Sequence, residues 1–448
     1  MPTDTPPASA ATRMGDVDGD GDLDIFAADG YAQGSGVVGR LYVNNGQGAF
    51  EEAVGAIPNS IDGQDIDDVE FADVDRDFDL DLLVNAHSGG AGALWLNDGQ
   101  GTFAAGGTLA PPGPGSQFHY NVTPCDVDGD GDLDLWVDNV GGNYTEQLQI
   151  NDGDGNFTDE TSSRVTGNAA GSDDNGVICA DIDDDGDFDA VVIALGSPER
   201  LLQNDGAGSF TFVANAFPGP TNCSLWGEMG DLNGDDRLDL VTGQGECSSS
   251  DEVYLGNDQM PVDAKPPVIV AVRPMPSVEQ GSVAAAQFAV SDRTVTDEGP
   301  RLARAYAVLD PAGAATEIPA TFMGGDLFRA EVPAAALGTF TFRACAVDPA
   351  GNETCSTDQS YTVVEDTGEG GGGAGMGGAS NAGGNGNGGA NGPGGGSANG
   401  GGGGAIDDGG GSGDGCDCGL AKQTTRSPWA ILSLIGTAIA LRARRRRR

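Results

Sequence analysis

The stretch DVDGDGDLD at residues 16–24 guides the interpretation of the whole chain. Four further stretches follow the same pattern: DVDRDFDLD at 73–81, DVDGDGDLD at 126–134, DIDDDGDFD at 181–189 and DLNGDDRLD at 231–239. Each has an oxygen-bearing side chain at its first, third, fifth and ninth positions, so that one short loop can surround a hard cation. Calcium takes about six to eight oxygen ligands in adaptable geometry. We therefore expect one Ca²⁺ ion in each of the five loops.

The predicted ligands occupy the same positions in every loop. The side-chain ligands are Asp16, Asp18, Asp20, Asp24, Asp73, Asp75, Asp77, Asp81, Asp126, Asp128, Asp130, Asp134, Asp181, Asp183, Asp185, Asp189, Asp231, Asn233, Asp235 and Asp239. At the seventh position the expected ligand is the backbone carbonyl, contributed by Asp22, Asp79, Asp132, Asp187 and Arg237. The sequence thus predicts one metal site in each repeat. We predict no catalytic residue.

Two loops differ at the sixth position, where Gly21, Gly131 and Gly186 permit a sharp turn in the other three. Phe78 stands there in the second loop, and a bulky side chain disfavours positive φ, so we expect a weaker or distorted site. Asp236 stands there in the fifth loop and tolerates the left-handed conformation. The fifth loop also has one carboxylate fewer and an arginine, which predicts weaker binding.

The acidic stretches recur at a near-regular period, with first residues at 16, 73, 126, 181 and 231. Such a period indicates a repeat architecture. A second element follows each loop: LYVNNGQGAF from residue 41, LWLNDGQGTF from 94, LQINDGDGNF from 148, LLQNDGAGSF from 201 and a degraded VYLGNDQM from 253. Apolar residues ahead of an Asn-Asp-Gly turn predict a β-hairpin. Each repeat then holds about four short strands, the content of one propeller blade.

Loop and hairpin together resemble the FG-GAP and VCBS repeats of integrin-like β-propellers, over about residues 15–260. The resemblance implies a calcium-loop β-propeller. Propellers of this kind commonly have about seven blades, whereas this chain has five recognisable repeats. Either a short ring closes on itself or an upstream segment supplies further blades. The absence of an apolar export signal before residue 15 favours the second alternative.

The fold class expected for the whole chain is all-β, with four parts. We assign residues 1–263 to the propeller, 264–365 to an Ig-like β-sandwich, 366–415 to a Gly-rich linker and 416–448 to a C-terminal tail. Alternation of apolar and polar residues between Pro, Gly and Asp breakers predicts the sandwich. Its last segment, FRACAVDPAGNETC, resembles the final hairpin of bacterial Ig-like domains. The linker composition predicts a disordered tether.

The tail combines a Gly-rich lead, two cysteines, a short apolar segment expected to be helical and an arginine cluster. It resembles the MYXO-CTERM sorting tail. The resemblance implies a sorting protease that cuts near Cys416 or Cys418, export, and C-terminal anchoring at the cell surface or outer envelope. An uncleaved membrane anchor is the alternative, and the apolar segment is shorter than the about 20 residues usual for a span.

The eight cysteines indicate an oxidising compartment, because several lie at hairpin distance from one another. We expect disulfides between Cys345 and Cys355 and between Cys223 and Cys247. Cys125 and Cys179 precede the third and fourth loops with an offset of one residue. Side chains alternate faces along a strand, so that pairing stays open.

The net charge of −48 repels phosphate backbones and argues against nucleic-acid binding. The only two histidines, His87 and His119, lie in different repeats and suggest no hydrolytic site. Trp95, Trp136 and Trp226 are candidates for glycan stacking, although strand positions favour core packing for the first two. We therefore expect a protein that is not an enzyme.

The function expected from the sequence is adhesion or ligand binding at the bacterial cell surface, with the propeller face contacting an extracellular protein or glycan. The partner stays unidentified. One alternative is a structural protein of the cell envelope without a diffusible ligand. Another is a calcium-dependent polysaccharide-active enzyme such as a lyase, since such enzymes also use propellers.

Overall fold

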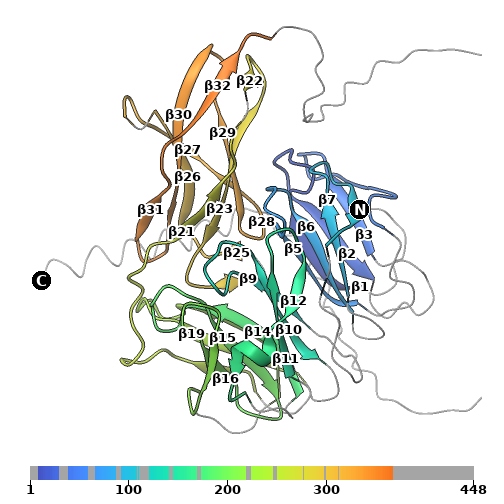
Figure 1. The fold of residues 1–448 in the computed structure, drawn as a ribbon, viewed down its shortest axis with the longest axis vertical. Coiled ribbons are helices and arrows are strands. Elements are labelled where there is room, and N and C mark those ends of the chain that lie inside the picture. The colour runs from blue at the N-terminus through green and yellow to red at the C-terminus, as the bar shows by residue number, and fades with distance from the viewer. Residues whose placement is uncertain are drawn as a thin grey trace, which may run out of the picture. The chain divides into compact units, whose positions relative to one another are not determined.

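The fold is described from a computed structural model (Figure 1). The residues that it describes are 9–29, 39–58, 66–86, 92–107, 109, 121–140, 145–168, 173–217, 223–245, 250–275, 277–296, 299–310 and 312–366. The chain divides into two compact units, Met1–Ala379 and Ser380–Arg448, and every described residue lies in the first. The predictions for the linker, the tail, Cys416, Cys418, Cys247, His87 and His119 concern residues outside this description.

Over the described residues the repeats form five sheets that follow one another along the chain, antiparallel except for one added strand in the fourth. The first two contain β1 (Ser9–Gly15), β2 (Asp24–Asp29), β3 (Gly39–Asn44) and β4 (Phe50–Glu52), then β5 (Ile66–Ala72), β6 (Asp81–Ala86), β7 (Ala93–Asn97) and β8 (Phe103–Ala105). The third contains β9 (Val122–Cys125), β10 (Asp134–Val140), β11 (Thr145–Asn151) and β12 (Phe157–Asp159).

The fourth and fifth sheets depart slightly from this plan. The fourth contains β14 (Asp173–Ala180), β15 (Asp189–Leu195), β16 (Arg200–Gln203) and β17 (Phe210–Val213), with β13 (Val165–Thr166) added parallel to β17 after the short helix α1 (Thr161–Arg164). The fifth has three strands, β18 (Ser224–Gly230), β19 (Asp239–Gln244) and β20 (Glu252–Tyr254). Among the described residues, the degraded fifth hairpin therefore ends in a sheet with one strand fewer than each of the first three.

The first strands of consecutive sheets contact one another, β1 with β5, β5 with β9, β9 with β14 and β14 with β18. This arrangement is consistent with propeller blades. Over the described residues no strand pairing joins the fifth sheet to the first, and closure of a ring is not detected. The all-β prediction is confirmed, while a closed propeller stays a prediction.

The hairpin turns owe their shape to paired hydrogen bonds and to glycine. In the second repeat the Asp98 carboxylate accepts the amides of Gln100 and Thr102 at 3.0 and 3.1 Å. Gly99 and Gly101 both have positive φ, 71° and 73°, which L-residues with a side chain rarely adopt. The Asn-Asp-Gly-x-Gly sequence therefore specifies this turn.

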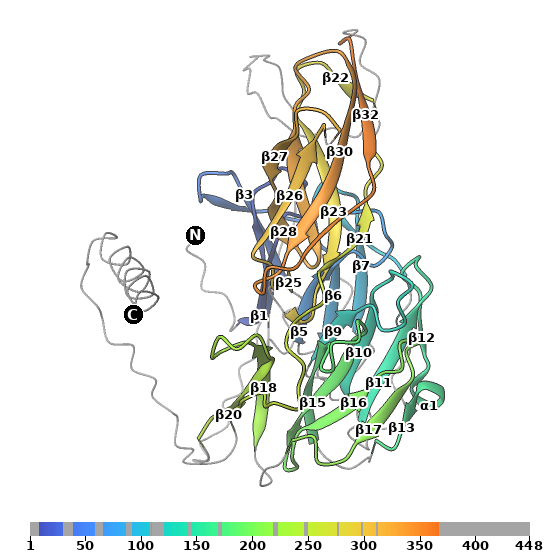
Figure 2. The same cartoon turned by 90° about the vertical axis from the view of Figure 1, so that its left-hand side faces the viewer.

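Residues 268–364 form a second β domain of two facing sheets and a small two-stranded one. One sheet contains β21 (Val268–Val272), β23 (Ala284–Ser291), β29 (Leu327–Val332) and β28 (Thr321–Gly324). The other contains β22 (Val278–Glu279), β32 (Gln359–Val364), β30 (Gly338–Val347), β26 (Arg304–Leu309), β27 (Thr316–Pro319) and β31 (Glu353–Cys355), and the small sheet pairs β24 (Val295–Thr296) with β25 (Gly299–Pro300). The long strands β30 and β32 run side by side (Figure 2).

This second β domain shares a hydrophobic core with the first two repeats. Met323 and Leu327, which are 1% and 0% exposed, belong to the same buried cluster as Phe26 and Leu80. The backbone amide of Asp16 also donates to the carbonyl of Met323 at 2.6 Å. Removal of the second β domain would therefore uncover part of the core of the first repeats.

Two sequence predictions, one on buried tryptophans and one on a disulfide, are borne out in this structure. Trp95 and Trp136 are each 1% exposed and lie in the core, as their strand positions predicted. Cys345 and Cys355 face each other in the register of β30 and β31 and form a disulfide. Trp226 is half-buried and lines a cavity.

The pairing left open from the sequence is present: Cys125 forms a disulfide with Cys179. Alternation along one strand does not decide this pairing, because β9 and β14 belong to adjacent sheets and both side chains enter the same buried cluster. Cys223 is also disulfide-bonded. These bonds are typical of an extracellular protein. No helix among the described residues is long and apolar enough to cross a membrane.

Candidate metal centres

Each acidic loop connects the first strand of its sheet to the second, and the ninth aspartate opens the second strand. The ninth aspartates are all buried, with exposed fractions of 2% or less. One carboxylate oxygen accepts the amide of the loop's second residue, and the other accepts the amide of the hairpin. The pairs of donors are Val17 and Asn44 for Asp24, Val74 and Asn97 for Asp81, Val127 and Asn151 for Asp134, Ile182 and Asn204 for Asp189, and Leu232 and Gly256 for Asp239.

These bonds explain why loop and hairpin occur together in the sequence. The ninth aspartate holds the start of the loop against the hairpin of the same sheet, whatever else it binds. A carboxylate oxygen has two lone pairs, so an oxygen that accepts one amide can still coordinate a cation. The ninth aspartate thus serves both the fold of the loop and its candidate metal site.

The first aspartate closes the turn in the same way in all five loops. Its Oδ2 atom accepts the amide of the sixth residue at 2.9 to 3.0 Å. The sixth residue has positive φ in every loop: Gly21, Phe78, Gly131, Gly186 and Asp236. The fourth residue also has positive φ throughout, at Gly19, Arg76, Gly129, Asp184 and Gly234. The sequence analysis missed this second requirement, although glycine at three of the five positions was a signal for it.

Phe78 adopts a φ of 68° despite its side chain, so the second loop keeps the turn of the others. The side chain is 8% exposed and belongs to the core cluster that includes Leu80 and Leu327. Burial of an aromatic side chain offsets the conformational cost, which is of order 1–2 kcal/mol. The local preference against this conformation is therefore overridden by packing.

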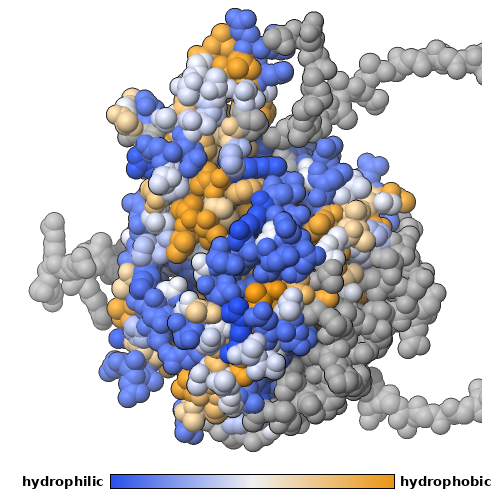
Figure 3. All heavy atoms as spheres, viewed as in Figure 1, coloured by the Kyte–Doolittle hydropathy of each residue, from blue (hydrophilic) through white to orange (hydrophobic). Residues whose placement is uncertain are grey.

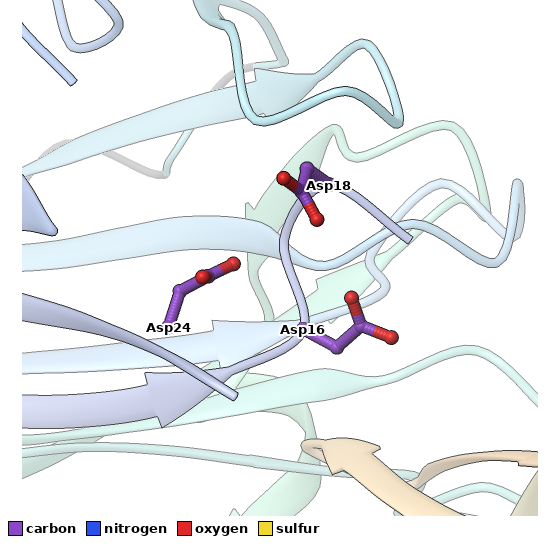
Figure 4. A group of neighbouring side chains, drawn as sticks. All are labelled: Asp16, Asp18 and Asp24. Atoms are coloured by element: carbon purple, nitrogen blue, oxygen red, sulfur yellow. The ribbon is translucent and has the colours of Figure 1, made fainter. Parts of the chain in front are cut away.

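Carboxylates from four loops gather closely enough to hold a cation. The groups are Asp16, Asp18 and Asp24; Asp73, Asp75 and Asp81; Asp126, Asp128 and Asp134; and Asp181, Asp183 and Asp185, with ligand atoms within 4.8 Å of one another in each group. Figure 4 shows the first group, with two carboxylates from the loop and one from the start of β2. Of the residues predicted from the sequence, the structure thus brings together the first, third and ninth in three loops, and the first, third and fifth in the fourth.

Three of these groups contain a buried oxygen atom that could coordinate a cation. The Oδ1 atoms of Asp16, Asp75 and Asp128 are buried and have no hydrogen-bond partner within the described part of the chain. A buried acceptor without a partner is costly and calls for a partner that the protein does not supply. Hard carboxylate oxygens of this kind are the ligands that calcium prefers. The residues present therefore fit Ca²⁺.

Burial raises the pKa values of the loop carboxylates. The pKa of Asp24 and of Asp134 rises to about 7, and that of Asp81 to about 8, because burial disfavours the charged form more than the backbone amides favour it. Neighbouring aspartates of the same loop raise these values further. A divalent cation would favour the ionised forms and reverse this effect.

The fifth loop has a different environment. Asp231 is exposed. Burial raises its pKa, but backbone amides, foremost those of Asp236 and Gly234, together lower it below its usual value. Arg237 lies 3.6 Å from the carboxylate of Asp235 and supplies positive charge from within the loop. These features agree with the weaker binding expected at 231–239, which stays a prediction.

The carbonyl ligands expected at the seventh positions stay a prediction. The amide of the seventh residue donates to the fifth carboxylate in every loop, at 2.9 to 3.3 Å. The side chains of Asp22, Asp79, Asp132 and Asp187 point at the hairpin glycines 46, 99, 153 and 206. A Cβ atom on glycines 46, 99 and 153 would lie less than 3.0 Å from the facing carboxylate, so that the aspartate would have to move, and one on Gly206 would lie 3.1 Å from it.

Cations from outside the loops contact the acidic loops. Arg329 donates to the carbonyl of Gly19 at 2.6 Å, Arg164 lies 3.2 Å from the carboxylate of Asp128, and Lys265 donates to the carbonyl of Asp185 at 3.0 Å. The sequence analysis did not find these residues. Arg329 and Lys265 are far from their loops in sequence, and no local signal indicates such contacts.

A cavity of about 60 Å³ lies between the first strands of four sheets and the second β domain. Its walls include Val122, Val177 and Trp226 from the repeats and Val290 from β23. A buried water needs on the order of 10–15 Å³, so the cavity has room for a few waters. It is much smaller than the roughly 300–1,000 Å³ of typical ligand pockets.

Comparison with known proteins identifies the repeats. The family model described as "FG-GAP-like repeat" matches residues 16–84, 84–137 and 181–242, and these matches contain all five acidic loops. A comparison with curated proteins finds no match. Among solved structures, dimeric latent PorU from Porphyromonas gingivalis is similar at 11% identity and a TM-score of 0.19, covering 66% of this chain and 24% of that one. A TM-score this low carries no argument. The conclusion from the family match is that this all-β chain contains FG-GAP-like repeats.

Proposed function

We propose that the protein binds calcium in its FG-GAP-like repeats and, in that form, binds an extracellular protein or glycan at the cell surface. The observation that carries the proposal is the recurrence of an aspartate triad at the same place in four repeats. Bound calcium would neutralise these carboxylates and hold each loop to its strands. The disulfides support an extracellular location.

The proposed contact surface is the end of the sheets away from the acidic loops. In an antiparallel sheet the second strand runs away from the acidic loop, so its last residues lie at the end opposite that loop. The acidic end is partly occupied, because Met323 and Arg293 of the second β domain contact Asp16 and Asp181 there. Figure 3 shows one face of the molecule as mainly hydrophilic with separate apolar patches, a mixture that suits polar partners such as glycans.

We further propose that the second β domain is Ig-like and that the C-terminal tail directs sorting and anchoring through a protease acting near Cys416 or Cys418. The support for both is the sequence resemblance. Surface labelling of intact cells, with and without substitution of both cysteines by serine, tests the anchoring. Labelling that is independent of the two cysteines would contradict the sorting proposal.

Binding of the whole chain to glycan and surface-protein arrays, with calcium and with excess chelator, tests the function. The proposal predicts binding that the chelator abolishes. Calcium-dependent depolymerisation of a polysaccharide would instead favour the lyase. Binding to no partner, together with an envelope that is weakened by loss of the protein, would favour the structural role.

A further inference from the structure

The hairpin asparagines connect each acidic loop with the loop of the preceding repeat. Asn97 donates its Nδ2 atom to the carbonyl of Leu80, in the loop of its own repeat, at 3.1 Å. The same nitrogen donates to the carbonyl of Val17, in the loop of the first repeat, at 2.8 Å. Both groups are acceptors, so the amide nitrogen must face them. Asn97 is 7% exposed, and loss of these bonds would leave buried carbonyls without partners.

The same arrangement occurs twice more along the chain. Asn151 donates to the carbonyl of Val74 in the second loop at 2.9 Å and to that of Leu133 in the third at 3.1 Å. Asn204 donates to the carbonyl of Val127 in the third loop at 2.7 Å, and to that of Phe188 in the fourth at 3.0 Å. Three asparagines thus connect four consecutive loops.

Each asparagine contacts backbone next to candidate metal ligands in one loop and a candidate ligand itself in the other. Val17 lies between Asp16 and Asp18, so its carbonyl moves with the backbone that carries both carboxylates. At the other side of the connection, the backbone amide of Asn97 donates to the carboxylate of Asp81 at 2.9 Å. A backbone adjustment that accompanies cation binding in the first loop therefore reaches a ligand of the second loop through one residue.

We infer that Asn97, Asn151 and Asn204 couple calcium binding in the first four loops, so that an ion in one loop raises the affinity of the next. The inference rests on the proposed calcium binding. The asparagines act as positioning residues, because they hold the backbone of the ligands and are not ligands themselves. Coupling between sites is typically a factor of about 5 to 150 in affinity.

The connection changes at the fifth repeat. Gly256 stands where the other hairpins have asparagine, and it keeps only the backbone bond to Asp239, at 2.7 Å. Arg293 of the second β domain bridges the fourth and fifth loops instead, donating to the carbonyls of Asp181 at 3.1 Å and Asp236 at 3.4 Å. Coupling to the fifth loop therefore passes through the second β domain.

The coupling is tested most sharply between the first and second loops. The second and third loops have an additional bridge, because Arg76 donates to the carbonyl of Asp130, and this bridge would complicate a test there. The experiment measures amide hydrogen exchange of segment 16–24 in the full chain as a function of calcium concentration. The double substitution Asp75→Asn and Asp77→Asn weakens the second loop without touching Asp81 or Asn97. We expect it to raise the calcium midpoint for protection of 16–24 by about fivefold or more.

In an Asn97→Ala background the same double substitution should leave the midpoint of 16–24 unchanged. Asn44→Ala is the matched control: Asn44 donates to the carbonyl of Leu23 in its own loop at 3.2 Å, and the described residues show no bond from it to another loop. The coupling should persist in that background. Asn97→Ser, which keeps a small polar side chain, replaces Asn97→Ala if the latter does not fold.

The outcomes separate the two proposals. If calcium never protects segment 16–24 in the unaltered protein, the proposed calcium binding fails and the coupling fails with it. If calcium protects the segment but weakening of the second loop leaves its midpoint unchanged, calcium binding stands and the coupling is wrong. A shift that persists in the Asn97 variant would show that another route carries the coupling, and would overturn the role assigned to the asparagine.

Discussion

Arg329 lies 3.3 Å from the carboxylate of Asp16, with side chains that are 3% and 1% exposed. The two residues come from different parts of the chain, the second β domain and the first acidic loop. A buried carboxylate needs a cation or strong hydrogen bonds to keep its charge. The guanidinium group of Arg329 therefore already places one positive charge beside the first loop, and calcium would add a second.

Arg329→Met should destabilise the calcium-free protein by about 3–5 kcal/mol, because it leaves Asp16 buried without its cation. Methionine keeps an unbranched apolar side chain in place of the arginine stem. With calcium bound the loss should be smaller, and the first loop should bind calcium more tightly because a competing charge is gone. Urea unfolding with calcium and with chelator measures both effects.

Arg304→Met is the control for Arg329→Met. Arg304 pairs with Glu317 at 2.9 Å, but both side chains are at least half exposed. An exposed pair contributes about 0–1 kcal/mol, so the loss should be small and independent of calcium. Equal losses for the two variants would contradict the role given to Arg329.

The raised carboxylate pKa values predict that the calcium-free protein loses stability as pH rises. Asp24, Asp134 and Asp189 have folded-state pKa values of about 7 and Asp81 of about 8, against an ordinary value of 3.8. The folded state then binds more protons than the unfolded state between about pH 4 and pH 8. This contribution is complete below the ordinary pKa and disappears as pH rises through the folded values.

Calcium should reverse that trend, because only the ionised carboxylates bind it and binding releases protons. The apparent calcium affinity is expected to increase between about pH 6 and pH 8. Urea unfolding at several pH values, with and without calcium, checks both directions. A metal-free protein that became more stable from pH 5 to pH 8 would show that the aspartates are not held as described.

Phe78→Gly should lower stability by roughly 2–3 kcal/mol while leaving calcium binding by the second loop nearly unchanged. Loss of a buried aromatic side chain costs about 3–5 kcal/mol, and relief of the left-handed conformation returns about 1–2 kcal/mol. The backbone turn is the same in the other loops, so the ligand geometry should persist. Denaturant unfolding measures the loss of stability. Hydrogen exchange of segment 73–81 during a calcium titration measures the calcium affinity of the second loop. A more stable variant would mean that packing does not hold this turn.

Arg200→Met should be strongly destabilising, by about 3–5 kcal/mol at neutral pH. Arg200 pairs with Glu146 at 2.5 Å and also with Asp174, and both carboxylates are buried between adjacent sheets. Burial and the neighbouring Glu146 raise the pKa of Asp174 to about 9, so the loss should grow as pH rises through that value and Asp174 becomes charged. Arg343→Met, at a partly exposed pair with Asp358, is the control and should cost little.

Local patterns in the sequence predicted much of the fold. The acidic loops, the Asn-Asp-Gly hairpins and the buried Trp95 and Trp136 follow from spacing and alternation within single repeats. The pairing of Cys345 with Cys355 follows from a short turn between two strands. Each of these features depends on residues close together in sequence, where backbone geometry leaves few choices.

Features that depend on packing between distant segments were not predictable in the same way. Alternation along one strand could not pair Cys125 with Cys179 across two sheets. A rule about φ could not show that burial would hold Phe78 in a left-handed conformation. Nothing local placed Arg329 beside Asp16, or showed that the hairpin asparagines reach the preceding loop, because these contacts appear only when the sheets are packed together.

The melting temperature of the whole chain, measured in millimolar calcium, in millimolar magnesium and in excess chelator, tests the central claim most directly. The whole chain is needed because Met323 and Leu327 complete the core of the first repeats. Each filled site adds about 2.7 kcal/mol at one hundred times its dissociation constant. If the protein binds calcium, its melting temperature should be much higher in calcium than in chelator, and magnesium should not raise it as far. A folded protein whose melting temperature is the same in all three conditions would contradict it.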